Sequence, residues 1–140
     1  RTFADGRRYE GDFVESRAHG HGAFRDADGT SYVGEWREDR KHGYGRWEHT
    51  DVLYEGYWAC DEKSGQGREV WCDGVRYEGE FFRGLKHGKG VIAFNDGGRY
   101  EGDFRRDEMD GEGRYEFPGG KVYAGQWQGG SITGQGRMDF

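Results

Sequence analysis

A sequence of about 23 residues recurs six times in this chain, and it constrains the fold more than any other feature. Each repeat opens with a tyrosine, followed by glycine two residues later and by an aromatic residue after two more. A Gly-x-Gly element begins seven residues after that aromatic residue. The opening tyrosines, spaced 23, 22, 23, 23 and 23 residues apart, are Tyr9, Tyr32, Tyr54, Tyr77, Tyr100 and Tyr123. A fixed period of this length predicts an array whose repeats stack on their neighbours.

Numbering each repeat from its tyrosine reveals the alternation that is typical of strands. Positions 1, 3 and 5 share one face of a strand, and so do positions 12, 14, 16 and 18. All but three aromatic residues occupy positions 1, 5, 16 or 18, and the exceptions are Tyr44, Tyr57 and Phe82. We therefore predict an all-β fold, an elongated, twisted, single-layer antiparallel meander of about twelve strands, with one aromatic face and one charged face.

The spacing also predicts how the strands pair. A six-residue loop inside each repeat sets position 5 opposite position 12, position 3 opposite position 14, and position 1 opposite position 16. Tight-turn dipeptides such as Asp28-Gly29 join successive repeats. This connection is expected to set position 18 opposite the next tyrosine, and the glycine at position 14 opposite the next ring at position 5. Each internal ring at position 5 would then lie between two glycines. The 22-residue spacing places a one-residue deletion near Asp51, inside such a turn.

Acidic residues at positions 2 and 4 and arginine at position 15 lie on the other face of the predicted sheet. Cross-strand pairing is expected to bring Glu55 next to Arg68, and Glu101 next to Arg114. A solvated face that keeps the array soluble explains this pattern, and an acidic docking face is the alternative.

The repeat resembles the MORN repeat, Y-x-G-x-W followed by H-G-x-G, and three copies carry the histidine, at His19, His42 and His87. The resemblance covers a single array over 1–140, with a partial repeat over 1–8 and repeats over 9–31, 32–53, 54–76, 77–99, 100–122 and 123–140. Because Arg1 falls within a repeat, we expect a longer array. The resemblance implies a non-catalytic scaffold or protein-interaction module that is cytoplasmic and associated with the cytoskeleton. The alternative is a phosphoinositide-binding, membrane-targeting module attached to an enzyme elsewhere in the full chain.

The aromatic face is the first candidate site. Exposed or half-exposed rings in an extended groove are typical of protein-interaction surfaces. The partner-binding groove would centre on the middle repeats, at Trp36, Tyr54, Trp58, Tyr77 and Phe81. The alternative is that these rings pack against each other as a thin core.

Charge argues against nucleic acid as a partner. The net charge is −6, whereas non-specific nucleic-acid binding depends on neutralising phosphates. Arg37, Arg40 and Lys41 at a loop edge are the candidates for contact with anionic lipid. Acidic residues are interleaved with them, and scattered arginines are weakened by nearby carboxylates and by salt screening.

We predict no enzymatic activity, no cofactor and no metal site. The repeated histidines are expected roughly 10 Å apart, too far to share one zinc ion. No catalytic Ser/His/Asp or Cys/His set is indicated, and each Gly-x-Gly precedes a strand rather than a helix, so no phosphate-binding loop is supported. Two cysteines suit a reducing compartment. A zinc ion shared between chains through Cys60 or Cys72 with His49 is the alternative.

The last repeat differs from the others because its loop, residues 129–133, is uncharged. A terminal strand with free backbone groups pairs with other chains unless it is blocked. We therefore expect an antiparallel homodimer through the last repeats, since two-fold contacts are the commonest. The contact residues would be Tyr123, Trp127, Ile132, Met138 and Phe140. In a longer natural chain, a further strand would cover this edge instead.

Overall fold

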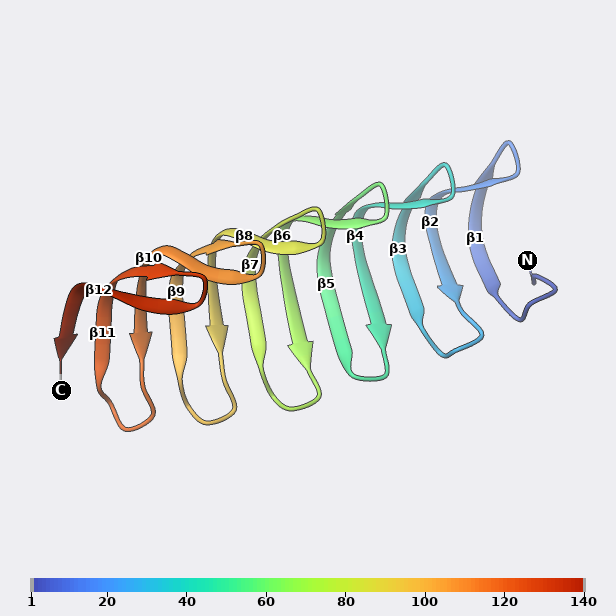
Figure 1. Cartoon of the computed structure of the whole chain (residues 1–140). Helices are drawn as coiled ribbons and strands as arrows, with labels where there is room; N and C mark the ends of the chain where they lie inside the picture. Colours follow the sequence, from blue (N-terminus) through green and yellow to red (C-terminus); the bar gives the residue numbers. More distant parts are fainter. Residues whose placement is uncertain (1, 140) are drawn as a thin grey trace.

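The computed structural model describes residues 2–139 as one open antiparallel sheet of twelve strands, paired in chain order. Figure 1 shows the strands side by side, with the two chain ends at opposite ends of the array. The predicted fold class is confirmed. The strands are β1 (Arg8–Val14), β2 (Arg17–Arg25), β3 (Ser31–Arg37), β4 (Arg40–His49), β5 (Val52–Ala59), β6 (Glu62–Trp71), β7 (Arg76–Phe82), β8 (Leu85–Ala93), β9 (Arg99–Arg105), β10 (Glu108–Glu116), β11 (Val122–Gln128) and β12 (Ser131–Asp139).

The connection inside each repeat is a two-residue turn, so the expected six-residue loop is wrong. In the second repeat, Glu38 and Asp39 form this turn with φ values of 48° and 65°. Positive φ at both central residues gives the turn the twist that a tight hairpin needs. The same hairpin has a bulge between positions 3 and 5, before the turn. After the turn it has a left-handed glycine at position 12, such as Gly43 with φ 89°. Figure 1 shows the hairpin tips, the ends that carry these turns, bent over along one edge of the sheet.

The strand register confirms part of the expected pairing and corrects the rest. Inside the second repeat, Tyr32 lies opposite Trp47 and Gly34 opposite Gly45, as expected. Trp36 lies opposite Lys41, however, because the short turn moves position 10 into register with position 5. Between repeats, position 16 pairs with the next tyrosine, position 14 with the next glycine at position 3, and position 12 with the next ring. Each internal ring at position 5 therefore has glycine on one side only.

The rings at positions 1 and 5 form a continuous aromatic ladder on what we call the inner face. Each internal tyrosine packs edge-on against the aromatic residue of its own repeat and against that of the next. Tyr54, for example, lies 5.1 Å from Trp58 and 5.1 Å from Phe81, measured between ring centroids. Its hydroxyl donates a hydrogen bond of 2.8 Å to the carbonyl oxygen of Tyr57. Apart from Phe13 in the first repeat, which is 43% exposed, the ladder is buried and forms the core of this one-layer fold.

The glycine columns exist because the tyrosine rings lie across them. A Cβ atom added to Gly90 would approach the Tyr77 ring and hydroxyl closer than the 3.0 Å limit of real contacts. The same holds for the glycine at position 14 in every repeat. Glycine normally weakens a strand, and here it makes the space that the core occupies.

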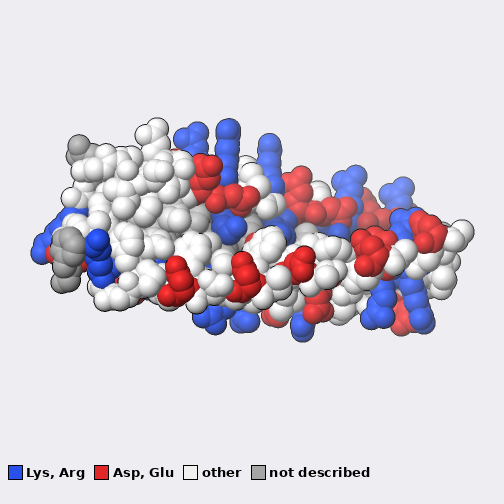
Figure 2. Space-filling model, turned by 60° about the horizontal axis from the view of Figure 1, so that its bottom comes forward, with Lys and Arg blue, Asp and Glu red and all other residues white. Residues whose placement is uncertain are grey.

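The opposite, outer face carries the charges. Glu55 lies opposite Arg68, and Arg114 opposite Glu101, as the sequence predicts. The ion pairs at these positions are different, with Glu55 joined to Arg46 at 4.0 Å and Arg114 to Glu116 at 2.8 Å. Figure 2 shows acidic and basic side chains interspersed along most of the molecule, and a broad uncharged area near the C-terminal end.

Candidate interaction surfaces

The rings predicted to form the partner-binding groove are buried. Trp36, Tyr54, Trp58, Tyr77 and Phe81 are 8%, 0%, 6%, 0% and 4% exposed. The expectation that they are exposed is therefore wrong, and the alternative, a thin core, describes their place in the fold. The bend of the hairpin tips brings position 10 opposite these rings, which the predicted register does not allow. A partner on this face must touch the side chains that border the ladder.

Half-buried apolar side chains border the ladder along the inner face. They lie at positions 10, 16 and 18, and they are Phe3, Phe24, Trp47, Ile92, Met109, Tyr115 and Phe117. The described chain forms one sheet, so no second layer from residues 2–139 covers this border. Single-layer packing therefore leaves a row of partly exposed aromatic and aliphatic side chains along the array, interrupted in repeat 3 by Glu69.

Three lysines at position 10 lie over the ladder in the central repeats. The side chains of Lys41, Lys63 and Lys86 are only 22%, 19% and 15% exposed. The Lys63 ammonium lies 5.3 Å from the centre of the Tyr54 ring, within the range of a cation–π interaction. Sequence analysis missed this row because the predicted register places position 10 in a loop.

Glu69 is a buried carboxylate at the centre of this row, 3% exposed, at a position that is apolar in the five other repeats. It lies 2.6 Å from the Lys63 ammonium and 3.9 Å from that of Lys86, and it accepts a 3.0 Å hydrogen bond from the Trp71 indole. Burial, followed by the charge of Glu69, raises the pKa of Tyr54 well above its usual range. The sequence alone could have drawn attention to Glu69, because it is a charged residue at a position that is otherwise apolar.

The hairpin tip of repeat 4 explains why repeat 3 has a carboxylate, Glu69, at a position that is apolar elsewhere. At position 8 of other repeats an aspartate accepts the backbone N–H of position 10 in the preceding repeat, as Asp61 does from Lys41 and Asp107 from Lys86, each at 2.8 Å. Both aspartates also lie 3.8 Å from those ammonium groups. Repeat 4 has Gly84 at position 8, so Lys63 has no such partner. Glu69, six residues further along β6, supplies the missing negative charge.

Comparison with known proteins identifies the family of this repeat. MORN repeats match residues 9–31, 32–51, 54–76, 77–99, 100–122 and 123–140. The chain belongs to the MORN-repeat family. The MORN repeat is in general a non-catalytic module, found in proteins associated with the cytoskeleton and with membranes.

The fold is similar to a solved structure, the TCP domain of SAS-4 (dCPAP) in complex with a proline-rich motif of Ana2 (dSTIL) from Drosophila melanogaster. The TM-score is 0.55 at 14% identity, over 90% of this chain and 68% of that chain. This likeness shows the fold alone. No curated protein matches the chain.

The basic residues predicted to contact lipid do not form one patch in the MORN array. Arg37 and Arg40 lie opposite each other at a hairpin tip and are exposed. Lys41 lies on the inner face, over the Tyr32 and Trp58 rings and 3.8 Å from Asp61. Its charge is therefore already paired. No helix within residues 2–139 is long and apolar enough to cross a membrane.

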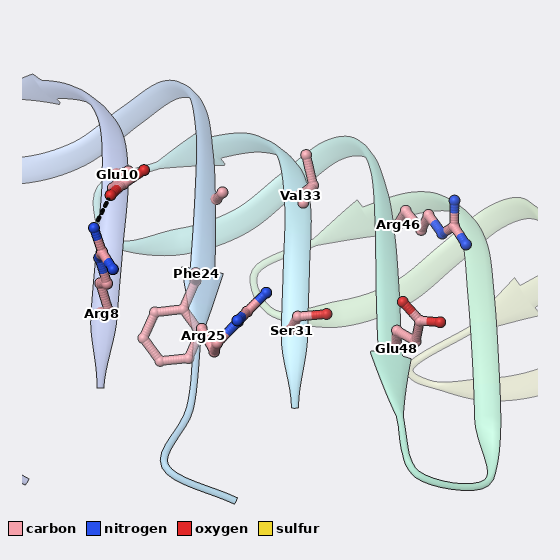
Figure 3. Close-up of a pocket in the computed structure, with 9 residues that line it drawn as sticks. Arg8, Glu10, Phe24, Arg25, Ser31, Val33, Arg46 and Glu48 are labelled. Atoms are coloured by element: carbon pink, nitrogen blue, oxygen red, sulfur yellow. Dashed lines mark hydrogen bonds and ion pairs between the residues drawn. The ribbon is translucent and has the colours of Figure 1, made fainter. Parts of the chain in front are cut away.

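A shallow hollow of about 560 Å³ lies across the outer side of β1 to β4. Figure 3 shows Val33 and Ser31 in the middle of the lining, with Arg8 joined to Glu10 at one side and Arg46 next to Glu48 at the other. Three arginines and two glutamates line it, so the two signs of charge are mixed with only a slight excess of positive charge.

Metal ligands do not gather in the part of the chain that the structure describes. No group of three or more His, Cys, Asp or Glu side chains between residues 2 and 139 is placed to hold an ion. Cys60 and Cys72 are both free and exposed. A zinc ion shared between chains stays a prediction.

The residues predicted for dimerisation divide into two groups. Tyr123 and Trp127 are 3% and 7% exposed, since they belong to the ladder. Ile132 and Met138 are 38% and 37% exposed on β12, the last strand of the described sheet. Phe140 lies outside the described residues. An interface at this end would therefore use Ile132, Met138 and the edge of β12 that pairs with no other strand of residues 2–139.

Proposed function

We propose that this MORN array is a non-catalytic protein-interaction module whose inner face binds an extended segment of a partner. The observation that carries this proposal is the row of half-buried aromatic and apolar side chains along the ladder, which no second layer of the described chain covers. Such side chains offer a partner apolar area at low entropic cost, because the sheet already holds them in place.

The chemistry of the inner face favours an extended segment over a compact domain. Trp47, Ile92 and Tyr115 occupy position 16 of repeats 2, 4 and 5, so apolar side chains recur at intervals along one direction. Extended and proline-rich segments dock on aromatic surfaces of this kind without losing much conformational freedom. The fold neighbour in complex with a proline-rich motif supports including such segments among the partners tested.

Affinity purification from cells that contain the full-length protein tests this proposal. The inner-face variant carries Trp47→Ser, Ile92→Ser and Phe117→Ser, and its matched control carries Val14→Ser and Val33→Ser on the outer face, where both valines are exposed. We expect the inner-face variant to lose specific partners while its melting curve stays cooperative, and the control to retain them. Retention of every partner by the inner-face variant would contradict the proposal.

We further propose that the array forms an antiparallel homodimer through the edge of β12 that faces away from β11. Its support is the uncharged loop of the last repeat, the exposed Ile132 and Met138, and the uncharged area near this end in Figure 2. Light scattering at tens of micromolar is expected to give twice the chain mass. Ile132→Lys with Met138→Lys is expected to return the mass of one chain. A single-chain mass for the unmodified protein would exclude the dimer.

A cytoplasmic, cytoskeletal location is the setting in which such a scaffold would act, and membrane targeting is the rival setting. The rival rests on Arg37 and Arg40 without Lys41, which is paired on the other face. Two exposed arginines supply little attraction at physiological salt. Co-sedimentation with phosphoinositide vesicles is therefore expected to be weak. Tight binding that Arg37→Glu with Arg40→Glu abolishes would favour the membrane-targeting role.

A further inference from the structure

Four repeats use one of their own carboxylates to hold the bend on the outer face. The side chain at position 4 accepts a hydrogen bond from the backbone N–H at position 13, just after the left-handed glycine at position 12. Asp12 does so from His21, and Asp103 from Glu112 at 2.9 Å. Glu35 and Glu80 do the same from Tyr44 and Lys89. The carboxylate fills a notch beside the glycine.

Repeat 3 has the same backbone bend with an empty notch. Tyr57 stands at position 4 and carries no carboxylate. A Cβ atom added to Gly65 would meet only the Tyr57 Cβ, at 3.8 Å, whereas one added to Gly111 would lie 2.8 Å from an oxygen of Asp103. No side chain among residues 2–139 accepts a hydrogen bond from the Gln66 N–H, whereas a carboxylate accepts the corresponding N–H in repeats 1, 2, 4 and 5.

Exposed aromatic side chains and an arginine border this notch. Tyr57 and Tyr44 lie opposite each other, 51% and 49% exposed, with ring centroids 5.5 Å apart. Arg68 lies two residues beyond Gln66 on the same face of β6. Glu55 and Glu78 lie opposite it on the neighbouring strands, but neither forms an ion pair with it within residues 2–139. Because Glu35 and Glu80 are held by backbone N–H groups of their own repeats, neither fills the notch.

We propose that this notch binds an acidic side chain of a partner protein. The aspartate or glutamate carboxylate accepts the Gln66 N–H, in the place that the chain's own carboxylate occupies in four other repeats, and pairs with Arg68. Apolar atoms next to that carboxylate lie against the Tyr44 and Tyr57 rings. The site is on the outer face, so it is separate from the inner-face surface proposed above and is tested separately.

The test uses the blocked peptide N-acetyl-Leu-Asp-Leu-amide as the probe and its Asn counterpart as the control. Amide NMR spectra of the whole array report binding at the Gln66 N–H. We expect a saturable shift of this resonance with the Asp peptide. The Asn peptide is expected to bind at least about tenfold more weakly. Tyr57→Glu restores the chain's own carboxylate and is expected to abolish the shift. Tyr57→Phe keeps the notch open and is expected to preserve it.

Further variants separate the possible outcomes. Arg68→Gln is expected to weaken binding about tenfold without touching the bend, which keeps the test decisive if Tyr57→Glu fails to fold. Trp47→Ser on the inner face is expected to leave the titration unchanged. The proposal is overturned by the absence of a shift at Gln66, by equal affinity in Tyr57→Glu, or by a stronger response to inorganic phosphate or to phosphoinositide vesicles than to the Asp peptide.

Discussion

Repeats 3 and 5 of the array share one backbone and differ in how they place charge. In repeat 5 the carboxylate of Asp103 holds the bend on the outer face, and Tyr115 borders the ladder on the inner face. In repeat 3 the exposed Tyr57 stands in place of Asp103, and the buried Glu69 stands in place of Tyr115. Both repeats nevertheless bury their opening tyrosine completely, at Tyr100 and Tyr54.

The comparison teaches that the ladder and the glycine columns specify the fold, whereas the border and the outer face are free to vary. Repeat 3 balances its departures locally, since Glu69 replaces the counter-ion that Gly84 cannot provide to Lys63. Its outer notch has no such replacement. Stability should therefore depend on the shared residues strongly and on the differing residues weakly.

Alkaline pH should remove what the two repeats share, and it has the largest expected effect. Burial raises the pKa of Tyr100 to about 12 from its ordinary 10.0, and burial followed by Glu69 raises that of Tyr54 further still above the usual range. A raised folded-state pKa means that stability is complete below pH 10 and falls as pH rises toward the folded-state value. We expect cooperative unfolding above about pH 10 that coincides with tyrosinate absorbance. Ionisation of the ladder tyrosines near pH 10 in a folded array would contradict this.

Two tyrosines three residues apart on β5 offer the sharpest test of ladder against surface. Tyr54→Ala removes a fully buried ring and should lower the free energy of unfolding by about 3–5 kcal/mol. Tyr57→Ala removes a ring that is 51% exposed together with its contact with Tyr44, and should lower it by no more than about 1 kcal/mol. Urea unfolding of both variants measures the difference. Similar losses from the two substitutions would show that the outer face contributes to the core.

The ladder residues and strands are predictable from sequence because alternation alone assigns positions 1, 3 and 5 to one face. The pairing of positions 1 and 3 with 16 and 14 inside a repeat is predictable too, but the rest of the register is not. It depends on turns such as Glu38-Asp39, whose residues adopt positive φ without the glycine that usually marks it. Burial of rings such as Trp58 follows from that register and from the bend. The notch at Gly65 is visible only when the carboxylates of the other repeats are seen in place.

The counter-ion exchange in repeat 3 predicts an intermediate effect. Glu69→Gln leaves Lys63 without its 2.6 Å partner and should cost about 1–3 kcal/mol. Gly84 has φ 82°, close to the 70° of Asp107, so Gly84→Asp is compatible with the local backbone. The double variant should regain about 1 kcal/mol, because it restores the partner used in repeat 5. A double variant no more stable than Glu69→Gln would show that the aspartate does not replace the glutamate.

The smallest effect is expected on the outer face, where Tyr57→Glu makes repeat 3 resemble repeat 5. The new carboxylate gains the Gln66 N–H as a donor, a hydrogen bond to a charged group. It loses the edge-on contact with Tyr44, which is worth about 0.2–1 kcal/mol for a cross-strand pair. The free energy of unfolding should therefore rise by about 0.5 kcal/mol, and Tyr57→Gln, which lacks the charge, should gain less. Urea unfolding resolves the two when they are measured side by side with the unmodified chain. A loss of stability in Tyr57→Glu would mean that the notch does not accept a carboxylate, and that repeat 3 departs from repeat 5 in its backbone as well as in its side chains.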